Sequence, residues 1–371
     1  MKFKKRLLPF VRAVPDLLVF RIVAELLLWG CSALMAWLSS LLLGSAGKAS
    51  ISSGDFSFIF TNWQGYVLIL IAFAIVLLYV AVDVNALIIF CGRLLNGEKP
   101  SLFRAIRDGV ISLMSYANPR GLIVILYTTL ISPLIGLGFS VSLTRSLYIP
   151  RFISSVIDSN MLFFIGLNVL RLLLTVVFII YIFLPHGTLL DNMRMKDAGI
   201  ASRKLIKAHW KSYLLEMLRF ILLCLAAFIV LGLFCLVIPY LIVVIIPADD
   251  TTSLFLQTFV ASFGMLVLML LQGLMTAFLI MKITILYRSY QSNGEWQYRK
   301  APKRKHVFVI IASAFTLVMI VAFSLFAANF YDGFFPAEIS AGIVAHRAGG
   351  VEAPENTVKG IEVSSQLGAD G

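Results

Sequence analysis

The sequence predicts an all-α polytopic membrane protein: a helical bundle with about seven transmembrane helices, followed by a short segment of strand and helix. Of its 371 residues, 60% are hydrophobic and 13% are charged, with a mean hydropathy of +0.94. Soluble domains have roughly 45–50% apolar and about 25% charged residues. Apolar runs long enough to cross a bilayer recur along the chain, and basic residues cluster in alternate loops between them. These observations exclude a water-soluble enzyme, a disordered chain and a disulfide-rich secreted module.

Seven apolar runs reach the length of about 20 residues that a hydrocarbon core of about 30 Å requires. They are residues 17–43, 66–91, 121–143, 162–184, 214–246, 254–287 and 307–328. The fifth and sixth runs are longer than a bilayer requires, so we expect them to tilt or to extend beyond it. We expect Pro239 to kink the outer part of the fifth run.

The basic residues predict how the bundle is oriented. The N-terminal arm and the loops after the second, fourth and sixth runs hold 22 of the 31 Lys and Arg residues. Because cytoplasmic loops are enriched in Lys and Arg, the N-terminus is predicted to be cytoplasmic and the C-terminal segment extracytoplasmic in the cell membrane. The formal charge of +12 is spread over these loops, so the predicted partner is the lipid bilayer and not a nucleic acid.

Two of the basic loops have apolar residues at helical spacing. They are residues 101–116 and, with a rougher pattern, residues 197–213. Cations mixed with such a pattern are typical of amphipathic helices lying on an anionic leaflet. Docking of a partner protein is the alternative function for these two stretches.

Several charged residues lie within or near the apolar runs: Arg21, Glu25, Asp83, Arg171, Glu216, Arg219 and Lys282. A charge in the bilayer is costly, so each should be paired or should face a cavity. Arg21 with Glu25 and Glu216 with Arg219 can pair along one helix, whereas the other three need partners on other helices. Arg171 could instead bind a lipid phosphate. The four cysteines have no metal-ligand spacing and are expected to be small core residues.

The chain changes character after the seventh run, which divides it into a membrane domain (1–328), a linker (329–341) and a C-terminal segment (342–371). In that segment an apolar run ending at His346 predicts a buried strand. A turn and a helical pattern that starts near Asn356 follow it, as in the opening of a βαβ unit. His346 and Arg347 stand at the carboxyl end of the strand, where a (β/α)8 barrel builds its active site. Histidine can transfer protons near neutral pH, and arginine can bind phosphate through two hydrogen bonds.

Three short motifs give this segment a resemblance to a known enzyme family. They are AHRAGG at 345–350, APENT at 353–357 and LGAD at 367–370. Their order and spacing resemble the start of the catalytic barrel of the glycerophosphodiester phosphodiesterase family. The commonest family form has glycine where Ala348 stands. By their arrangement, the preceding helices resemble the membrane domain that some bacterial members carry before the barrel.

The resemblance implies a TIM-type (β/α)8 barrel that hydrolyses glycerophosphodiesters to glycerol 3-phosphate and an alcohol, assisted by a divalent cation, Mg²⁺ or Ca²⁺. By analogy, His346 is one of two acid/base histidines and Arg347 holds the phosphate. Glu355 and Asn356 lie in the family's conserved turn and organise the site or contact the substrate. A metal acts there by polarising phosphoryl oxygens.

The family's acidic metal ligands and its second histidine would come after Gly371, so no metal ligand is expected within this chain. A barrel of this type needs about 250 residues, and residues 342–371 supply only its first strand and helix. We therefore expect the printed sequence to be the leading part of a longer enzyme and to be inactive by itself. The alternative is a non-enzymatic integral membrane protein that binds or transports lipid or solute.

Overall fold

The computed structural model describes residues 2–48, 56–119, 121, 125, 159–237, 239–241, 250–292, 307–334 and 358–366. Every regular element within these residues is a helix. Six of the helical stretches are long and apolar enough to cross a membrane: Pro9–Ser45, Trp63–Leu95, Met161–Leu190, Met195–Leu241, Thr251–Gln291 and Ser313–Phe330. Each coincides with one of the predicted apolar runs. The remaining run, 121–143, lies outside the described residues except for positions 121 and 125, so the total of seven stays a prediction.

The chain divides into two compact units. The first comprises Met1–Leu233 and Met265–Ala314, and the second comprises Phe234–Gly264 and Phe315–Gly371.

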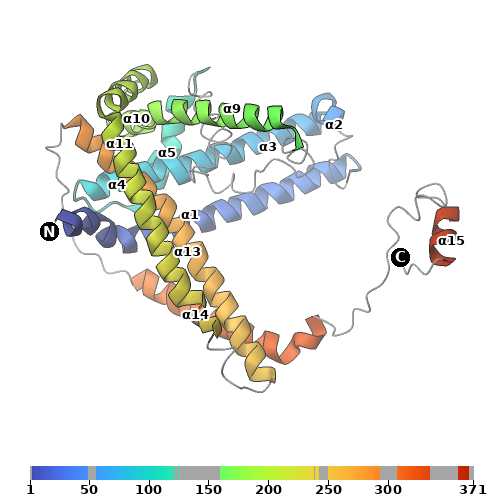
Figure 1. Cartoon of the computed structure of the whole chain (residues 1–371). Helices are drawn as coiled ribbons and strands as arrows, with labels where there is room; N and C mark the ends of the chain where they lie inside the picture. Colours follow the sequence, from blue (N-terminus) through green and yellow to red (C-terminus); the bar gives the residue numbers. More distant parts are fainter. Residues whose placement is uncertain are drawn as a thin grey trace. The chain divides into compact units, whose positions relative to one another are not determined.

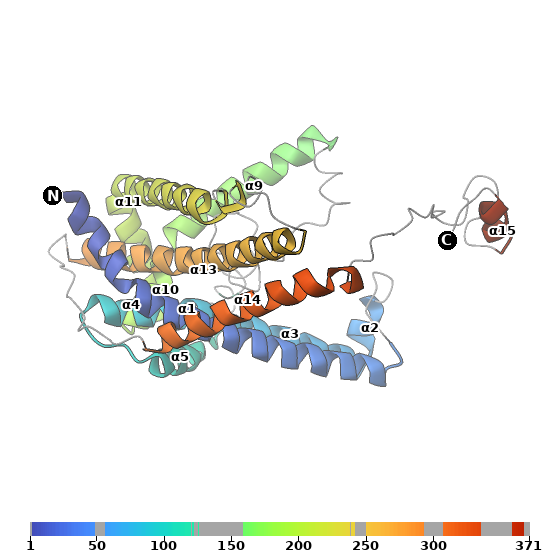
Figure 2. The same cartoon turned by 90° about the horizontal axis from the view of Figure 1, so that it is seen from below.

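Helix α1 (Lys2–Ser45) begins the first unit and buries one narrow stripe of side chains. The fully buried members are spaced three or four residues apart: Ala13, Leu17, Phe20, Ala24 and Leu28. This spacing places them on one face of a helix. In both views α1 runs beside α3 (Trp63–Tyr79), which the short α2 (Phe56–Thr61) precedes (Figures 1 and 2). The rings of Phe20 and Phe90 lie 5.0 Å apart in this core.

A π-helix, η2 (Val80–Ala86), separates α3 from α4 (Leu87–Leu95) within one predicted span. Asp83 and Asn85 are both buried in it. Helix α5 (Leu102–Ile111) and the 3-10 helix η3 (Ser112–Tyr116) pack over η2, which confirms helical structure for the amphipathic stretch 101–116. Gly109 permits the close approach, because a Cβ there would lie 2.5 Å from the carbonyl oxygen of Ala81.

The second core of this unit joins α9 (Met161–Ile180), α10 (Leu184–Leu190), α11 (Met195–Gly232) and α13 (Asp250–Gln291). The Asn160 side chain caps α9 by accepting hydrogen bonds from two backbone N–H groups at its start. The core is rich in aromatic residues: Phe178, Phe183, Tyr213, Tyr287 and Tyr290 are its buried rings. Phe183 packs edge-on to Tyr213, with ring centroids 6.1 Å apart.

The helical pattern predicted over 197–213 is confirmed, and its placement on an anionic leaflet stays a prediction. These residues form the first part of α11, which runs on into the span and is interrupted by non-helical dihedral angles at His209. The stretch is tied to the bundle by Ser202, whose hydroxyl donates to the carbonyl of Ile180 (2.8 Å) and accepts from the N–H of Phe183 (3.1 Å). These bonds satisfy backbone groups where α9 ends, so the stretch packs on the protein along one face.

The second unit contains most of the π-helix η6 (Leu233–Val237), the beginning of α13, most of α14 (Val307–Phe334) and α15 (Val358–Gln366). Helix η6 ends two residues before Pro239, whose missing N–H disfavours regular α-helical geometry. The predicted kink at Pro239 itself stays a prediction. Within α14 the buried Ser324 hydroxyl donates to the carbonyl of Ile320 (2.8 Å), which satisfies its polar group inside an apolar helix.

Candidate functional site

The four site residues predicted from the C-terminal motifs, His346, Arg347, Glu355 and Asn356, lie outside the described residues, as does the predicted strand at 342–346. The helical pattern after them is present as α15. Val358 and Ile361 of α15 are 75% and 59% exposed, so the apolar side of this helix is largely uncovered.

Buried charges join α1 to η2. The Arg21 guanidinium donates to a carboxylate oxygen of Asp83 at 2.8 Å and also pairs with Glu25. Arg21 and Asp83 are 4% and 3% exposed. Both the predicted pair along α1 and the predicted partner for Asp83 on another helix are confirmed. This triad joins two helices of the first unit within its larger apolar core.

A second set of charges joins α11 to α13. Glu216 accepts from the Nζ of Lys282 at 2.8 Å and from Arg219 at 3.1 Å, which confirms a cross-helix partner for Lys282. Arg171 differs, because its Nε is buried without a hydrogen-bond partner in the part of the chain that the structure describes. No ion pair joins Arg171 to another of the described residues, so its predicted pairing stays a prediction.

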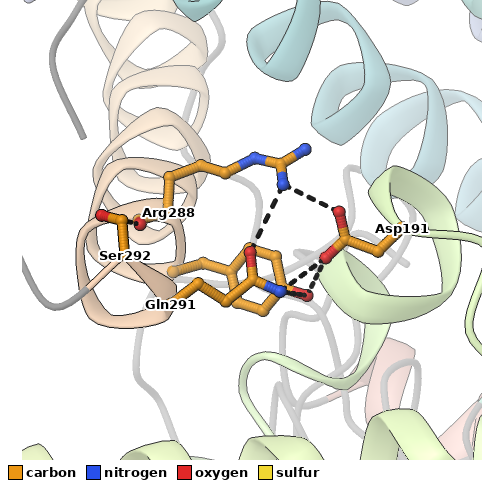
Figure 3. Close-up of polar contacts among 5 residues, drawn as sticks. Asp191, Arg288, Gln291 and Ser292 are labelled. Carbon is orange, nitrogen blue, oxygen red and sulfur yellow. Dashed lines mark hydrogen bonds and ion pairs between the residues drawn. The ribbon is translucent and has the colours of Figure 1, made fainter. Parts of the chain in front are cut away.

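A polar cluster lies where α10 ends beside the last turns of α13 (Figure 3). The Asp191 carboxylate accepts from Arg288 at 2.7 Å, from the amide of Gln291 at 2.8 Å and from the hydroxyl of Tyr287. Arg288 and Gln291 both point toward Asp191, which follows α10 directly. Burial acts to raise the pKa of Asp191, but these hydrogen bonds and the Arg288 charge outweigh it and hold that pKa below its usual range.

His186 lies deeper, on α10. It is 3% exposed, and its Nε2 is 3.1 Å from the hydroxyl oxygen of Thr284. The same hydroxyl donates to the carbonyl of Ile280 at 2.8 Å. A buried and partly satisfied histidine of this kind holds α10 to α13.

An apolar groove of about 690 Å³ is open between α9, α11 and α13 in the first unit. Its walls include Phe178, Met217, Phe228 and Met275. The hydroxyl of Thr175, also in the wall, donates to the carbonyl of the preceding turn at 2.8 Å. The groove therefore presents a mainly hydrocarbon surface, which is suited to an acyl chain and not to a charged headgroup.

No group of three or more His, Cys, Asp or Glu side chains that could hold a metal ion occurs among the described residues. The charged clusters do not fit a divalent cation, because each of their carboxylates is bound by Arg or Lys. All four cysteines are free, and Cys91 is fully buried, which confirms the interpretation of Cys91 as a core residue.

Residues 3–324 match a family described as the membrane domain of glycerophosphoryl diester phosphodiesterase. The chain belongs to this family. The match agrees with the resemblance seen in the C-terminal motifs, although it ends before them. No curated protein and no solved structure matches the chain.

Sequence reasoning did not single out the cluster around Asp191 or His186. Both stand near the end of an apolar run, and their partners come about one hundred residues later. Polar residues at the ends of membrane spans are common, so composition alone carried no signal. Polar residues at the ends of two different spans are the pattern that could have suggested this cluster. Here Asp191 follows one span, and Tyr287 and Arg288 lie in the last turns of another.

Proposed function

We propose that this protein is a membrane-anchored glycerophosphodiester phosphodiesterase, which hydrolyses glycerophosphodiesters to glycerol 3-phosphate and an alcohol. One observation carries the proposal: a chain whose residues 3–324 belong to the membrane-domain family of such enzymes continues into the AHRAGG and APENT motifs. Two separate parts of the sequence thus lead to one activity.

In the proposed reaction Arg347 binds the phosphate oxygens, and His346 transfers a proton as one of two acid/base histidines. Water attacks phosphorus, the bond between phosphorus and the alcohol oxygen breaks, and a proton reaches the departing oxygen, so the products are a monoester and a free alcohol. Arginine suits the first role because its fork matches phosphate, and histidine suits the second because it titrates near neutral pH. We assign Glu355 and Asn356 to the organisation of the site.

The proposal includes a divalent cation, Mg²⁺ or Ca²⁺, which would polarise the phosphoryl oxygens when bound. We place its ligands in the catalytic barrel, as the family resemblance implies. With the positive-inside assignment of the loops, the C-terminal segment works on the extracytoplasmic side of the membrane.

The test is an assay of glycerol 3-phosphate release from glycerophosphocholine by the natural gene product, including any residues encoded after Gly371. We expect release that EDTA abolishes and that His346→Ala reduces by at least a hundredfold, within the usual effect of acid–base groups. His209→Ala, at the break in α11, is the control histidine and should retain activity. Turnover that is unchanged by EDTA, or full activity after His346→Ala, would contradict the assigned roles.

A second candidate function, non-enzymatic binding or transport of lipid, is favoured by the apolar groove between α9, α11 and α13. Groove walls formed by three helices of the first unit offer space for a lipid chain. Cys224→Trp would fill the groove, and Thr175→Val is its mild control in the same wall. If lipid is the ligand, the tryptophan variant loses a fluorescent phospholipid that the valine variant retains, whereas His346→Ala leaves this binding unchanged.

A further inference from the structure

A basic pocket of about 500 Å³ lies at the junction of α4 and α5. It is lined by Arg93, Glu98, Lys99, Pro100, Ser101, Arg104, Arg107 and Asp108. Four cations face two carboxylates, so the pocket has an excess of two positive charges. None of these residues belongs to the motifs proposed to carry hydrolysis.

The end of α4 builds one side of the pocket through a tight turn. Gly97 has a φ of +82°, its N–H donates to Leu94, and the next N–H, of Glu98, donates to Arg93. These two bonds form a Schellman motif, which needs a left-handed residue that glycine supplies at low cost. The chain therefore reverses sharply at the last turn of a membrane span, which places Lys99 beside the start of α5.

Asp108 positions two of the cations without neutralising the pocket. It accepts from Arg93 at 2.6 Å and from the Nη2 of Arg107 at 3.0 Å. The hydrogen bond from Arg93, together with Arg107, lowers the pKa of this carboxyl below its usual range although burial opposes the shift, so it stays ionised. Lys99 and Arg104 are exposed and make no ion pair with any residue in the described ranges.

Helix α5 and the 3-10 helix η3 that follows it also expose large apolar side chains. Phe103 and Val110 of α5 are 77% and 43% exposed, and Met114 of η3 is 81% exposed. The opposite face is buried on η2 through Ala105 and Gly109. Cations and large apolar groups together on a helix too short to span are typical of the headgroup layer. The pocket also starts at Arg93, in the last turn of the candidate membrane span Trp63–Leu95.

We propose that this pocket binds the phosphate of an anionic phospholipid, while Phe103 and Met114 lie among its neighbouring acyl chains. Guanidinium groups match phosphate oxygens through paired hydrogen bonds, and pre-positioned forks lose less freedom on binding. A lipid is the occupant that fits both halves of the surface, because inorganic phosphate would leave the apolar side chains uncovered. The proposal does not depend on the hydrolase assignment.

The test measures binding of short-chain phosphatidylglycerol and of short-chain phosphatidylcholine to the detergent-solubilised protein by thermophoresis. Lys99→Gln with Arg104→Gln removes two cations that make no ion pair with the described residues. We expect affinity for phosphatidylglycerol to fall about tenfold or more, since each cation near an anionic surface contributes several-fold. Arg203→Gln with Lys204→Gln, two exposed cations on α11, is the matched control and should change affinity less than twofold.

Two further measurements distinguish binding of a phospholipid from binding of inorganic phosphate. Phe103→Gln should weaken phosphatidylglycerol binding and leave the melting temperature unchanged, because its side chain is exposed. Inorganic phosphate at the same concentration should not compete. Equal losses in the pocket and control variants, equal affinity for the two lipids, or full competition by inorganic phosphate would each overturn the proposal.

Discussion

Removal of the Asp83 carboxylate should test the energetic role of the buried charges between α1 and η2. At the observed 2.8 Å, the attraction between Arg21 and Asp83 is about 6 kcal/mol at an effective dielectric constant of 20. Desolvation of both ions offsets much of this attraction, and breaking one partner of a buried pair typically costs about 3–5 kcal/mol. Because Glu25 still pairs with Arg21, we expect Asp83→Ala to destabilise by about 3 kcal/mol, the low end of that range.

The assay is unfolding of the purified protein by sodium dodecyl sulfate in mixed micelles, followed by tryptophan fluorescence. Asp108→Ala provides a matched control, because it also removes a carboxylate bound to arginine, at 2.6 Å, but from a partly exposed site. Such pairs contribute about 0–1 kcal/mol. The difference between the two variants in the free energy of unfolding therefore measures the effect of burying the ion pair, apart from the effect of the pairing itself.

Replacing the whole triad provides a second check. Arg21→Met, Glu25→Gln and Asp83→Leu together remove all three charges of the triad, and buried ion pairs can often be replaced by apolar groups at little cost. We expect this triple variant to lie within about 1 kcal/mol of the wild type. The reasoning from buried charge fails if Asp83→Ala destabilises the protein no more than Asp108→Ala does. It also fails if the triple variant is the least stable of the variants.

Three other predictions concern packing, pH and topology. Gly109→Ala should lower the free energy of unfolding by about 1–3 kcal/mol in the same assay, because its Cβ would lie 2.5 Å from a backbone oxygen of Ala81. Gly166→Ala is the control, and it should be neutral or slightly stabilising because there is open space around that position. Asp191→Asn should flatten the acid limb of a melting-temperature profile between pH 3 and 7. The lowered pKa of Asp191 means that its stabilisation of the fold exists above the usual value of about 3.9 and is lost as pH falls through the folded value; an unchanged acid limb would contradict this. A C-terminal alkaline phosphatase fusion should be active and the corresponding green fluorescent protein fusion dark, and the reverse result would place the C-terminal segment in the cytosol.

The spans could be predicted because their cause is local. Each needs about 20 apolar residues and little else, and six predicted runs coincide with helices long enough to cross a membrane. The pairing of Arg21 with Glu25 was likewise predictable, since residues four apart on a helix are neighbours. The sequence also indicated that Asp83 and Lys282 need partners on other helices, because an unpaired charge in a membrane is costly.

The identity of those partners was not predictable, because it depends on how helices pack. Asp83 lies in a π-helix, and one extra residue per turn changes which face of the span it occupies. A regular 3.6-residue repeat would not indicate that face. The contact between α11 and α9 was not predictable for a related reason: the lysines between 197 and 213 indicate a polar face, but their spacing does not indicate that Ser202 binds the end of α9.

The polar side chains of this membrane domain fall into two classes with different predicted responses. Those between helices, such as Asp83 and Glu216, are bound by cations of other helices and serve the bundle, so their loss should lower stability. Lys99 and Arg104 are exposed in the pocket and lack such partners among the described residues, so their loss should lower lipid affinity and leave stability unchanged. A side chain bound within the protein has its charge already satisfied, whereas an exposed cation beside an apolar helix face retains its charge for a ligand. Measuring stability and lipid binding on both sets of variants therefore separates the residues that hold the helices together from those that contact the membrane.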